Sequence, residues 1–489
     1  MLRLDSAGGR WLLLVTVLGS AVAQVEATVV NIGLPAIGAD LDADIGALQW
    51  VLNGYLLTLA GLILLGGSLG DRLGRRQVFL AGVLVFTVMS AVCAIAPSVE
   101  VLVGARVVQG VGAALLTPGS LAMLEAVLRR EDRARAIGLW SATGGVAAAI
   151  GPLLGGWLVE LSWRWVFVLP IPLGLMVLWL AATKIPESRD ESATGGLDVR
   201  GAALATLGLA GLTFALVQAP EGPAGLVLAA GAVGVGLLLA FWRVESRTAE
   251  PMLDPALFSS RLFTVANLLT FVVYAGLGGV FFLFVVFLQV AMGYSPLQAG
   301  VSTLPITVLM LLLSARAGAL TQRIGPRLPL TVGPVLIAAG MLLLSSIDPG
   351  ESYLTGVLPG VVVLGLGLAA TVAPITSTAL AAADERHAGM ASGVNNAVAR
   401  TAQLAAVAAL PLAAGLSGEA YADPVAMGDA FTRAMWITAG LALVGAAVAA
   451  LGIPAGAPQR DIAQRHHLDC GVAGPPQRPS TPRETSARG

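Results

Sequence analysis

Two charged side chains lie inside long apolar runs of this sequence, and they are the clearest candidates for chemistry. Glu26 lies within the run 11–37, and Arg106 lies within the run 99–123. Each run is long enough to cross a bilayer as a helix, and a charge at that depth costs about 2.5–3.5 kcal/mol. Because charges are retained there mainly for function, we take both residues as candidate site residues.

The two charges are expected at compatible depths. With the helical rise per residue, Glu26 lies about 22 Å from the start of its run and Arg106 about 10 Å from the outer end of its run. Apolar surroundings favour a neutral carboxyl group, and a nearby guanidinium favours a charged one. If their separation changed between two conformations, proton uptake and release would alternate. A static ion pair is the other interpretation, and contact between the two stays open because sequence gives depth but not direction.

A basic hairpin, Gly67–Arg76, joins two apolar runs and is repeated in weaker form at 318–327. The repeat predicts two related halves, a mark of secondary transporters. Gly74 permits a tight turn, and Asp71 could bind a helix N-terminus or an arginine. If these contacts form in one conformation only, the hairpin is a cytoplasmic gate; otherwise it is a simple positive anchor. The candidate gate residues are Gly67, Asp71, Arg72, Gly74, Arg75 and Arg76.

Small residues recur at helical spacing between residues 144 and 156. Such stripes let helices approach closely, and a proline within one permits a bend. We expect a hinge or a tight seam here, although ordinary close packing would also explain the pattern. The candidate residues are Gly144, Gly151, Pro152, Gly155 and Gly156.

A third group consists of polar side chains inside apolar runs, some of which should line a substrate cavity while others bond to backbone. This group comprises Gln24, Thr28, Asn31, Asn53, Gln109 and Gln289.

Composition places these residues in a membrane protein. Of 489 residues, 56% are hydrophobic and only 12% charged, against about 25% charged in soluble proteins. The expected class is an all-α integral membrane protein with fourteen transmembrane helices. They are predicted near 11–37, 46–69, 77–96, 99–123, 136–160, 165–183, 200–219, 224–243, 263–290, 297–320, 328–347, 353–382, 389–415 and 430–453.

The repeat and the charges give the organisation. We expect two six-helix bundles, 11–183 and 263–453, separated by a linker with two inserted helices at 184–262. A short tail, 1–10, precedes them, and a disordered tail, 454–489, follows. With both termini cytoplasmic, only Arg164 and Arg433 fall in outer segments, as the positive-inside rule requires. Arg316 and Arg400 are counted with the cytoplasmic segments, toward helix ends.

Several functions are disfavoured. A net charge of −1 argues against nucleic acid as a partner. Cys93 and Cys470 are too far apart in sequence to suggest a metal cluster or disulfide framework. The three histidines fall at 387, 466 and 467, in predicted cytoplasmic segments, and no extramembrane region is large enough for a catalytic domain. We expect no enzymatic activity, no metal and no cofactor, with the proton as coupling ion.

These motifs together resemble the major facilitator superfamily, and most closely its fourteen-helix drug/proton antiporter branch. Gly67–Arg76 is similar to the superfamily's loop signature, 102–112 to its fourth-helix motif containing an arginine, and 144–156 to its antiporter motif. The stretch 26–37 is similar to the branch's first-helix motif, with Glu26 in place of the usual Asp.

The resemblance implies export of small amphipathic compounds in exchange for protons, by alternating access, across the plasma (inner) membrane. The expected partners are a small-molecule substrate, protons and lipid, and the expected state is a monomer. Two alternatives remain at this stage: an importer or symporter on the same fold, and a membrane receptor that has lost transport.

Overall fold

The computed structural model describes residues 1–189, 196–248, 251–348, 350–382 and 388–454, and their regular structure is helical apart from one isolated bridge, Leu2 to Leu128. The predicted tail 454–489 falls outside these residues except for Pro454. The first-half helices are α1 (Ala7–Leu41), α2 (Ile45–Leu73), α3 (Arg75–Ala94), α4 (Val99–Val127), α5 (Arg130–Leu161), α6 (Trp165–Val168) and α7 (Pro170–Lys184).

The remaining helices follow in chain order. An inserted pair comprises α8 (Val199–Gln218) and α9 (Ala224–Glu245). The second half contains α10 (Arg261–Val290), α11 (Pro296–Ser302), α12 (Leu304–Ile324), α13 (Arg327–Leu344), α14 (Leu358–Ala381), α15 (Ala388–Ala413) and α16 (Pro424–Gly452), with short turns η1 (Pro255–Ser259), η2 (Tyr353–Val357) and η4 (Gly418–Ala422).

Twelve helical stretches in the described residues are long and apolar enough to cross a bilayer. The helices α5 and α15, of 32 and 26 residues, are not among these twelve. The chain is therefore a multi-pass helical membrane protein, and a total of fourteen spans remains a prediction.

Two helices begin earlier than the hydropathy pattern predicts. The helix α1 begins at Ala7 because the Ser6 hydroxyl accepts a hydrogen bond from the Gly9 amide, an N-terminal cap. The helix α5 begins at Arg130, within a charged segment, with Glu131 and Asp132 in its first turn. Carboxylates there interact favourably with the helix dipole, so charged residues form the first turns of α5.

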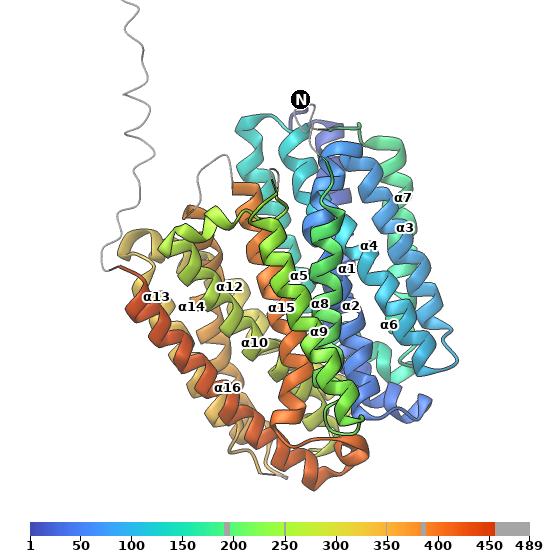
Figure 1. The fold of residues 1–489 in the computed structure, drawn as a ribbon, viewed down its shortest axis with the longest axis vertical. Coiled ribbons are helices and arrows are strands. Elements are labelled where there is room, and N and C mark those ends of the chain that lie inside the picture. The colour runs from blue at the N-terminus through green and yellow to red at the C-terminus, as the bar shows by residue number, and fades with distance from the viewer. Residues whose placement is uncertain (190–195, 249–250, 349, 383–387, 455–489) are drawn as a thin grey trace, which may run out of the picture.

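The two halves lie side by side, with the inserted pair at their junction (Figure 1). The helix α8 packs against both α2 and α15. Leu57 of α2, Leu209 of α8 and Leu404 of α15 share one apolar cluster. The inserted pair therefore contacts both halves.

Hydrogen bonds join the halves at the end of the molecule opposite the N-terminus. They connect the end of α1, the start of α2 and the end of α5 to the second half, and each fixes a backbone or side-chain group across the boundary. The partners are Gln49 with the carbonyls of Val407 and Ala408 at 2.6 and 3.1 Å, Tyr421 with Ala43 at 2.8 Å, Gln289 with Ile32 at 2.9 Å, and Ser295 with Glu160 at 2.7 Å.

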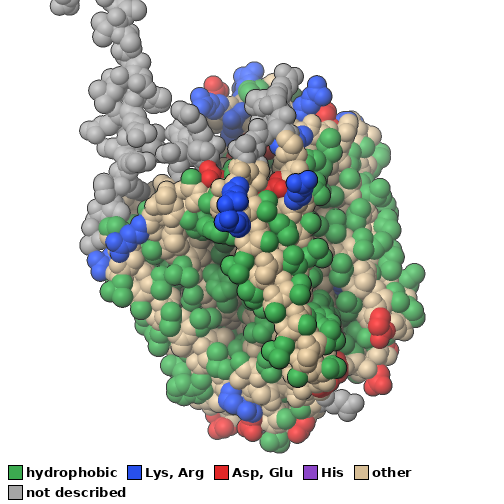
Figure 2. Space-filling view, viewed as in Figure 1, with side chains coloured by type: hydrophobic (Ala, Val, Ile, Leu, Met, Phe, Trp, Pro, Cys, Tyr) green, Lys and Arg blue, Asp and Glu red, His purple; other side chains and the backbone are tan. Residues whose placement is uncertain are grey.

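Charge is distributed unequally between the two ends. In Figure 2, Lys and Arg side chains gather at the end where Figure 1 places the N-terminus, and apolar side chains cover the surface between the ends. This is the asymmetry that the positive-inside rule uses to orient a membrane protein.

Candidate functional site

Glu26 and Arg106 form an ion pair in the interior of the first half. Arg106 Nη1 of α4 lies 2.9 Å from Glu26 Oε1 of α1, and each side chain is 1% exposed. The question of contact, which sequence leaves open, is thus answered by the structure. A buried pair of this kind is costly to break, because either charge alone would be left uncompensated.

Two uncharged residues extend this pair into a network. Gln109 Nε2 donates to Glu26 Oε1 at 2.6 Å and to Ser90 Oγ of α3 at 2.8 Å, while Gln109 Oε1 accepts from Arg106 Nη1 at 2.6 Å. Arg106 and Gln109 meet because residues three apart share a helix face. The network therefore ties α1, α3 and α4 together.

Arg106 is also held by α2. Its Nε donates to the Val51 carbonyl at 3.1 Å, and its guanidinium lies 4.3 Å from the centroid of the Tyr55 ring. These contacts keep the guanidinium in place independently of Glu26.

Glu26 has one oxygen free. Its Oε2 is buried and has no hydrogen-bond partner among the described residues. Beside it lies a small cavity of about 90 Å³, lined otherwise by apolar side chains of α1, α5, α6 and α7. A carboxyl group with one oxygen bound and the other unpaired in apolar surroundings is able to carry a proton on the unpaired oxygen.

The polar residues expected to line a cavity have different environments. Thr28 bonds to the Val25 carbonyl at 2.8 Å, and Asn31 Nδ2 lies 3.4 Å from the Ala27 carbonyl, so both bond within α1. Gln289 reaches across to α1, as described above. Asn53 of α2 is fully buried, and neither of its side-chain atoms has a partner among the described residues.

The small-residue stripe of α5 packs against both halves of the molecule. Toward α1, Gly144 faces the Gln24 amide, Gly151 faces Thr28, and Gly155 faces Val29. Toward α11, a Cβ built on Gly156 would lie 2.6 Å from the Leu297 Cα.

The Pro152 carbonyl also meets Gly300 of α11 in close contact. Pro152 and Gly156 therefore form part of the seam between the halves, and contact with backbone atoms leaves no room for a larger side chain at Gly156.

The basic hairpin is closed by its own side chains and by a residue that sequence reasoning missed. Asp71 Oδ1 lies 2.7 Å from Arg75 Nη2, and Gly74 turns the chain with φ +115°. Glu187 accepts hydrogen bonds from the backbone amides of Arg76 and Gln77 at 3.0 and 3.2 Å, which caps α3.

Arg76 Nη1 also donates to the Ile185 carbonyl at 2.9 Å. The hairpin is thus fastened to the segment that follows α7, the start of the linker between the halves. Gly67 lies beside Pro118 of α4, and Arg72 lies in the last turn of α2.

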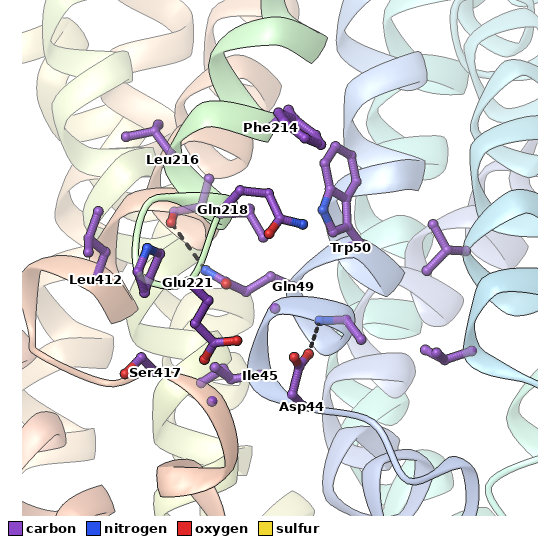
Figure 3. Close-up of a pocket in the computed structure, with 18 of the residues that line it drawn as sticks. Asp44, Ile45, Gln49, Trp50, Phe214, Leu216, Gln218, Glu221, Leu412 and Ser417 are labelled. Atoms are coloured by element: carbon purple, nitrogen blue, oxygen red, sulfur yellow. Dashed lines mark hydrogen bonds between the residues drawn. The ribbon is translucent and has the colours of Figure 1, made fainter. Parts of the chain in front are cut away.

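A larger cavity of about 560 Å³ opens at the end where the halves are joined. It is bounded by the start of α2, the start of α4, the α8–α9 connection and the end of α15. In Figure 3, Gln49 and Trp50 face Phe214, Gln218 and Glu221 across it. The six polar residues predicted for a cavity are not among its described lining residues.

Comparison with known proteins identifies the family. The model of the Major Facilitator Superfamily matches residues 16–407. The chain belongs to the Major Facilitator Superfamily.

Relatives of this superfamily member include resistance and export proteins. The puromycin resistance protein pur8 of Streptomyces alboniger is 37% identical over 398 residues, covering 79% of this chain and 78% of that protein. The tetracenomycin C resistance and export protein of Streptomyces glaucescens is 35% identical over 386 residues, covering 78% and 71%. Among solved structures, the POT family transporter PepTSo is 16% identical, covers 94% and 98%, and has a TM-score of 0.66, which shows the fold.

One charged residue of this superfamily member lies deeper than expected. Arg400 was counted with cytoplasmic segments, but it lies midway along α15. The predicted helix 389–415 agrees with this position, and the counting of charges by loop is what assigns Arg400 to a cytoplasmic segment. Ser90 and Glu187 gave no signal in sequence, since a serine and a loop glutamate are common in such segments.

Proposed function

We propose that this superfamily member is a proton-coupled exporter of small amphipathic compounds that works by alternating access. The observation that carries the proposal is the buried Glu26–Arg106 pair with its unpaired carboxyl oxygen. The named functions of relatives in resistance and export support the direction of transport.

The proposed coupling step is protonation of Glu26 at Oε2. Protonation removes the negative charge that holds Arg106 Nη1 and Gln109 Nε2, so the attraction between α1 and α4 weakens. Arg106 keeps its Val51 and Tyr55 contacts on α2. Loss of the proton restores the attraction. The packing of α1 against α4 therefore depends on whether Glu26 is protonated.

The change at α1 has a route to the boundary between the halves. The helix α1 packs on α5 through Gly151 and Gly155, and α5 meets α11 through Gly156. A shift of α1 is therefore passed to the seam. Release of the hydrogen bonds at the outer end would open the large cavity, which is the proposed exit.

Both termini are cytoplasmic in this proposal, and the protein is a monomer of the plasma (inner) membrane. The basic side chains at the end bearing the N-terminus support that orientation (Figure 2).

The test is proton flux in vesicles. The full chain is reconstituted in proteoliposomes with a pH-sensitive dye inside, and puromycin or ethidium is added to one side. Wild type should move protons opposite to the compound, Glu26→Asp should retain this flux, and Glu26→Gln should lose it while inserting normally. Full compound-driven proton flux in Glu26→Gln would overturn the assignment, and flux in the same direction as the compound would indicate a symporter.

A further inference from the structure

Arg400 places a positive charge at the middle of the second half. It follows the start of α15 at Ala388 by twelve residues and precedes its end at Ala413 by thirteen. With the helical rise it lies roughly 18–20 Å from either end. A cation at that depth is costly and calls for a partner.

The register between α15 and α2 shows which residues lie level with Arg400. At one end of the contact Gln49 bonds to the Val407 carbonyl, and at the other Gly393 lies against Leu64. The midpoint of this contact places Arg400 level with the centre of α2, close to Tyr55.

The helix α10 packs against α15 next to Arg400. Its Gly278 lies against the backbone of Gln403, where an added Cβ would be 2.8 Å from the Gln403 Cα. Tyr274 lies one turn earlier on α10, next to the level of Arg400. The Arg400 charge interacts electrostatically with both Tyr55 and Tyr274, one from each half.

Within the described residues, Arg400 has few hydrogen-bond partners and no ion-pair partner. Its one hydrogen bond in the described residues runs from Nη1 to Gln403 Oε1 at 3.3 Å, and no described carboxylate is within ion-pairing distance. Glu26 is already bound by Arg106. The Arg400 side chain is half-buried.

Further hydrogen-bond donors lie near the level of Arg400. In the described residues, the hydroxyl groups of Tyr55 and Tyr274 take part in no hydrogen bond. The Tyr55 ring is already stacked on the Arg106 guanidinium. The surroundings of Arg400 thus offer positive charge and O–H donors without an acceptor of matching charge.

We propose that Arg400, Tyr55 and Tyr274 bind an oxyanion of the exported compound, a carboxylate or phenolate on an apolar, aromatic body. The guanidinium fork matches a carboxylate with two parallel hydrogen bonds, and the tyrosines donate further ones. This inference rests on the proposed export function and names its substrate class. Because the Tyr55 ring lies on the Arg106 guanidinium, the bound anion lies next to the proton site.

The test is a binding comparison that needs no proton gradient. The full-length protein in detergent is titrated with 1-pyrenebutyric acid and with its uncharged amide, followed by fluorescence anisotropy. Wild type should bind the acid about tenfold more tightly than the amide, as expected for a hydrogen bond to a charged group. Arg400→Gln should abolish that preference with amide binding unchanged, and Arg400→Lys should retain part of it.

Arg316→Gln is the matched control, since Arg316 is an exposed arginine within α12 and should leave the preference intact. Equal binding of acid and amide by wild type, or an undiminished preference in Arg400→Gln, would overturn the proposal. If Arg400→Gln does not elute as a folded protein, the wild-type comparison and Arg400→Lys decide.

Two further measurements distinguish a substrate site from a lipid site, and this site from the proposed export function. Added phosphatidylglycerol that displaces the acid at equal concentration would show that the site takes a lipid phosphate instead of a substrate. Absence of compound-driven proton flux, with the acid preference intact, would count against the export function but not against this site.

Discussion

Gln109 donates a hydrogen bond to Glu26 across 2.6 Å, so an uncharged amide shares the carboxylate with Arg106. Both donors reach the same oxygen, Oε1, and leave Oε2 unpaired. The carboxyl group is therefore fixed in direction without being fully neutralised by hydrogen bonds. That arrangement suits a group that must gain and lose a proton while remaining in place.

Gln109→Leu should reduce compound-driven proton flux about tenfold while the protein still inserts. The substitution removes a bond to a charged group, worth about 1.5–3 kcal/mol, and leaves Ser90 Oγ without its donor. Flux in proteoliposomes and the thermal unfolding midpoint are the measurements. Thr117→Val on the same helix is the control, because the one side-chain hydrogen bond of Thr117 within the described residues is to the Ala113 carbonyl of its own helix. Equal flux in the two variants would show that Gln109 has no part in coupling.

Sequence and structure agree where hydropathy carries the information. The depth of Glu26 and Arg106 follows from the apolar runs around them, which form the helices α1 and α4. The contact between the two residues could not be predicted, because it depends on how α1 and α4 are rotated about their axes. The roles of Tyr55 and Glu187 could not be predicted for the same reason, since each depends on a packing partner that is distant in sequence.

Arg400 shows a different limit of sequence reasoning. Counting charges by loop assigns each arginine to the nearest polar segment. Arg400 is therefore assigned to the charged stretch before α15. The helix continues through Arg400 because its surroundings, rich in alanine, favour helix without being strongly apolar.

Gly156→Ala should impair transport because the added methyl group would wedge the seam between the halves. Its Cβ would meet the backbone of Leu297 and Pro296 at 2.6 and 2.7 Å, and backbone cannot move aside as a side chain can. Gly138→Ala on the same helix is the matched control, since nothing lies within 4 Å of its Cβ. The rate of compound efflux should fall several-fold in the first variant only. Similar efflux rates in both variants would show that close packing at the seam has no part in transport.

Gly74→Ala should destabilise the hairpin by about 1–3 kcal/mol, the usual cost of a strained backbone conformation. Gly74 has φ +115°, and its Cβ would lie 2.8 Å from the Glu187 carboxyl carbon. Displacing Glu187 would also uncap α3. Gly70→Ala is the control, because its nearest contacts are at 3.9 Å. Thermal unfolding in detergent measures the difference, and equal midpoints for the two variants would contradict it.

Asp71→Asn should slow turnover without changing which compounds are carried. The substitution weakens the bridge to Arg75, at 2.7 Å, but leaves the Glu187 cap and the Gly74 turn in place. Because Asp71 is 41% exposed and surface ion pairs contribute only about 0–1 kcal/mol, global stability should change little. The effect should therefore appear in the rate of conformational change, as a lower maximal efflux rate at unchanged apparent affinity. Efflux of several compounds across a concentration series measures both quantities. An altered order of preference among those compounds would show that the hairpin acts on substrate binding and not on the gate.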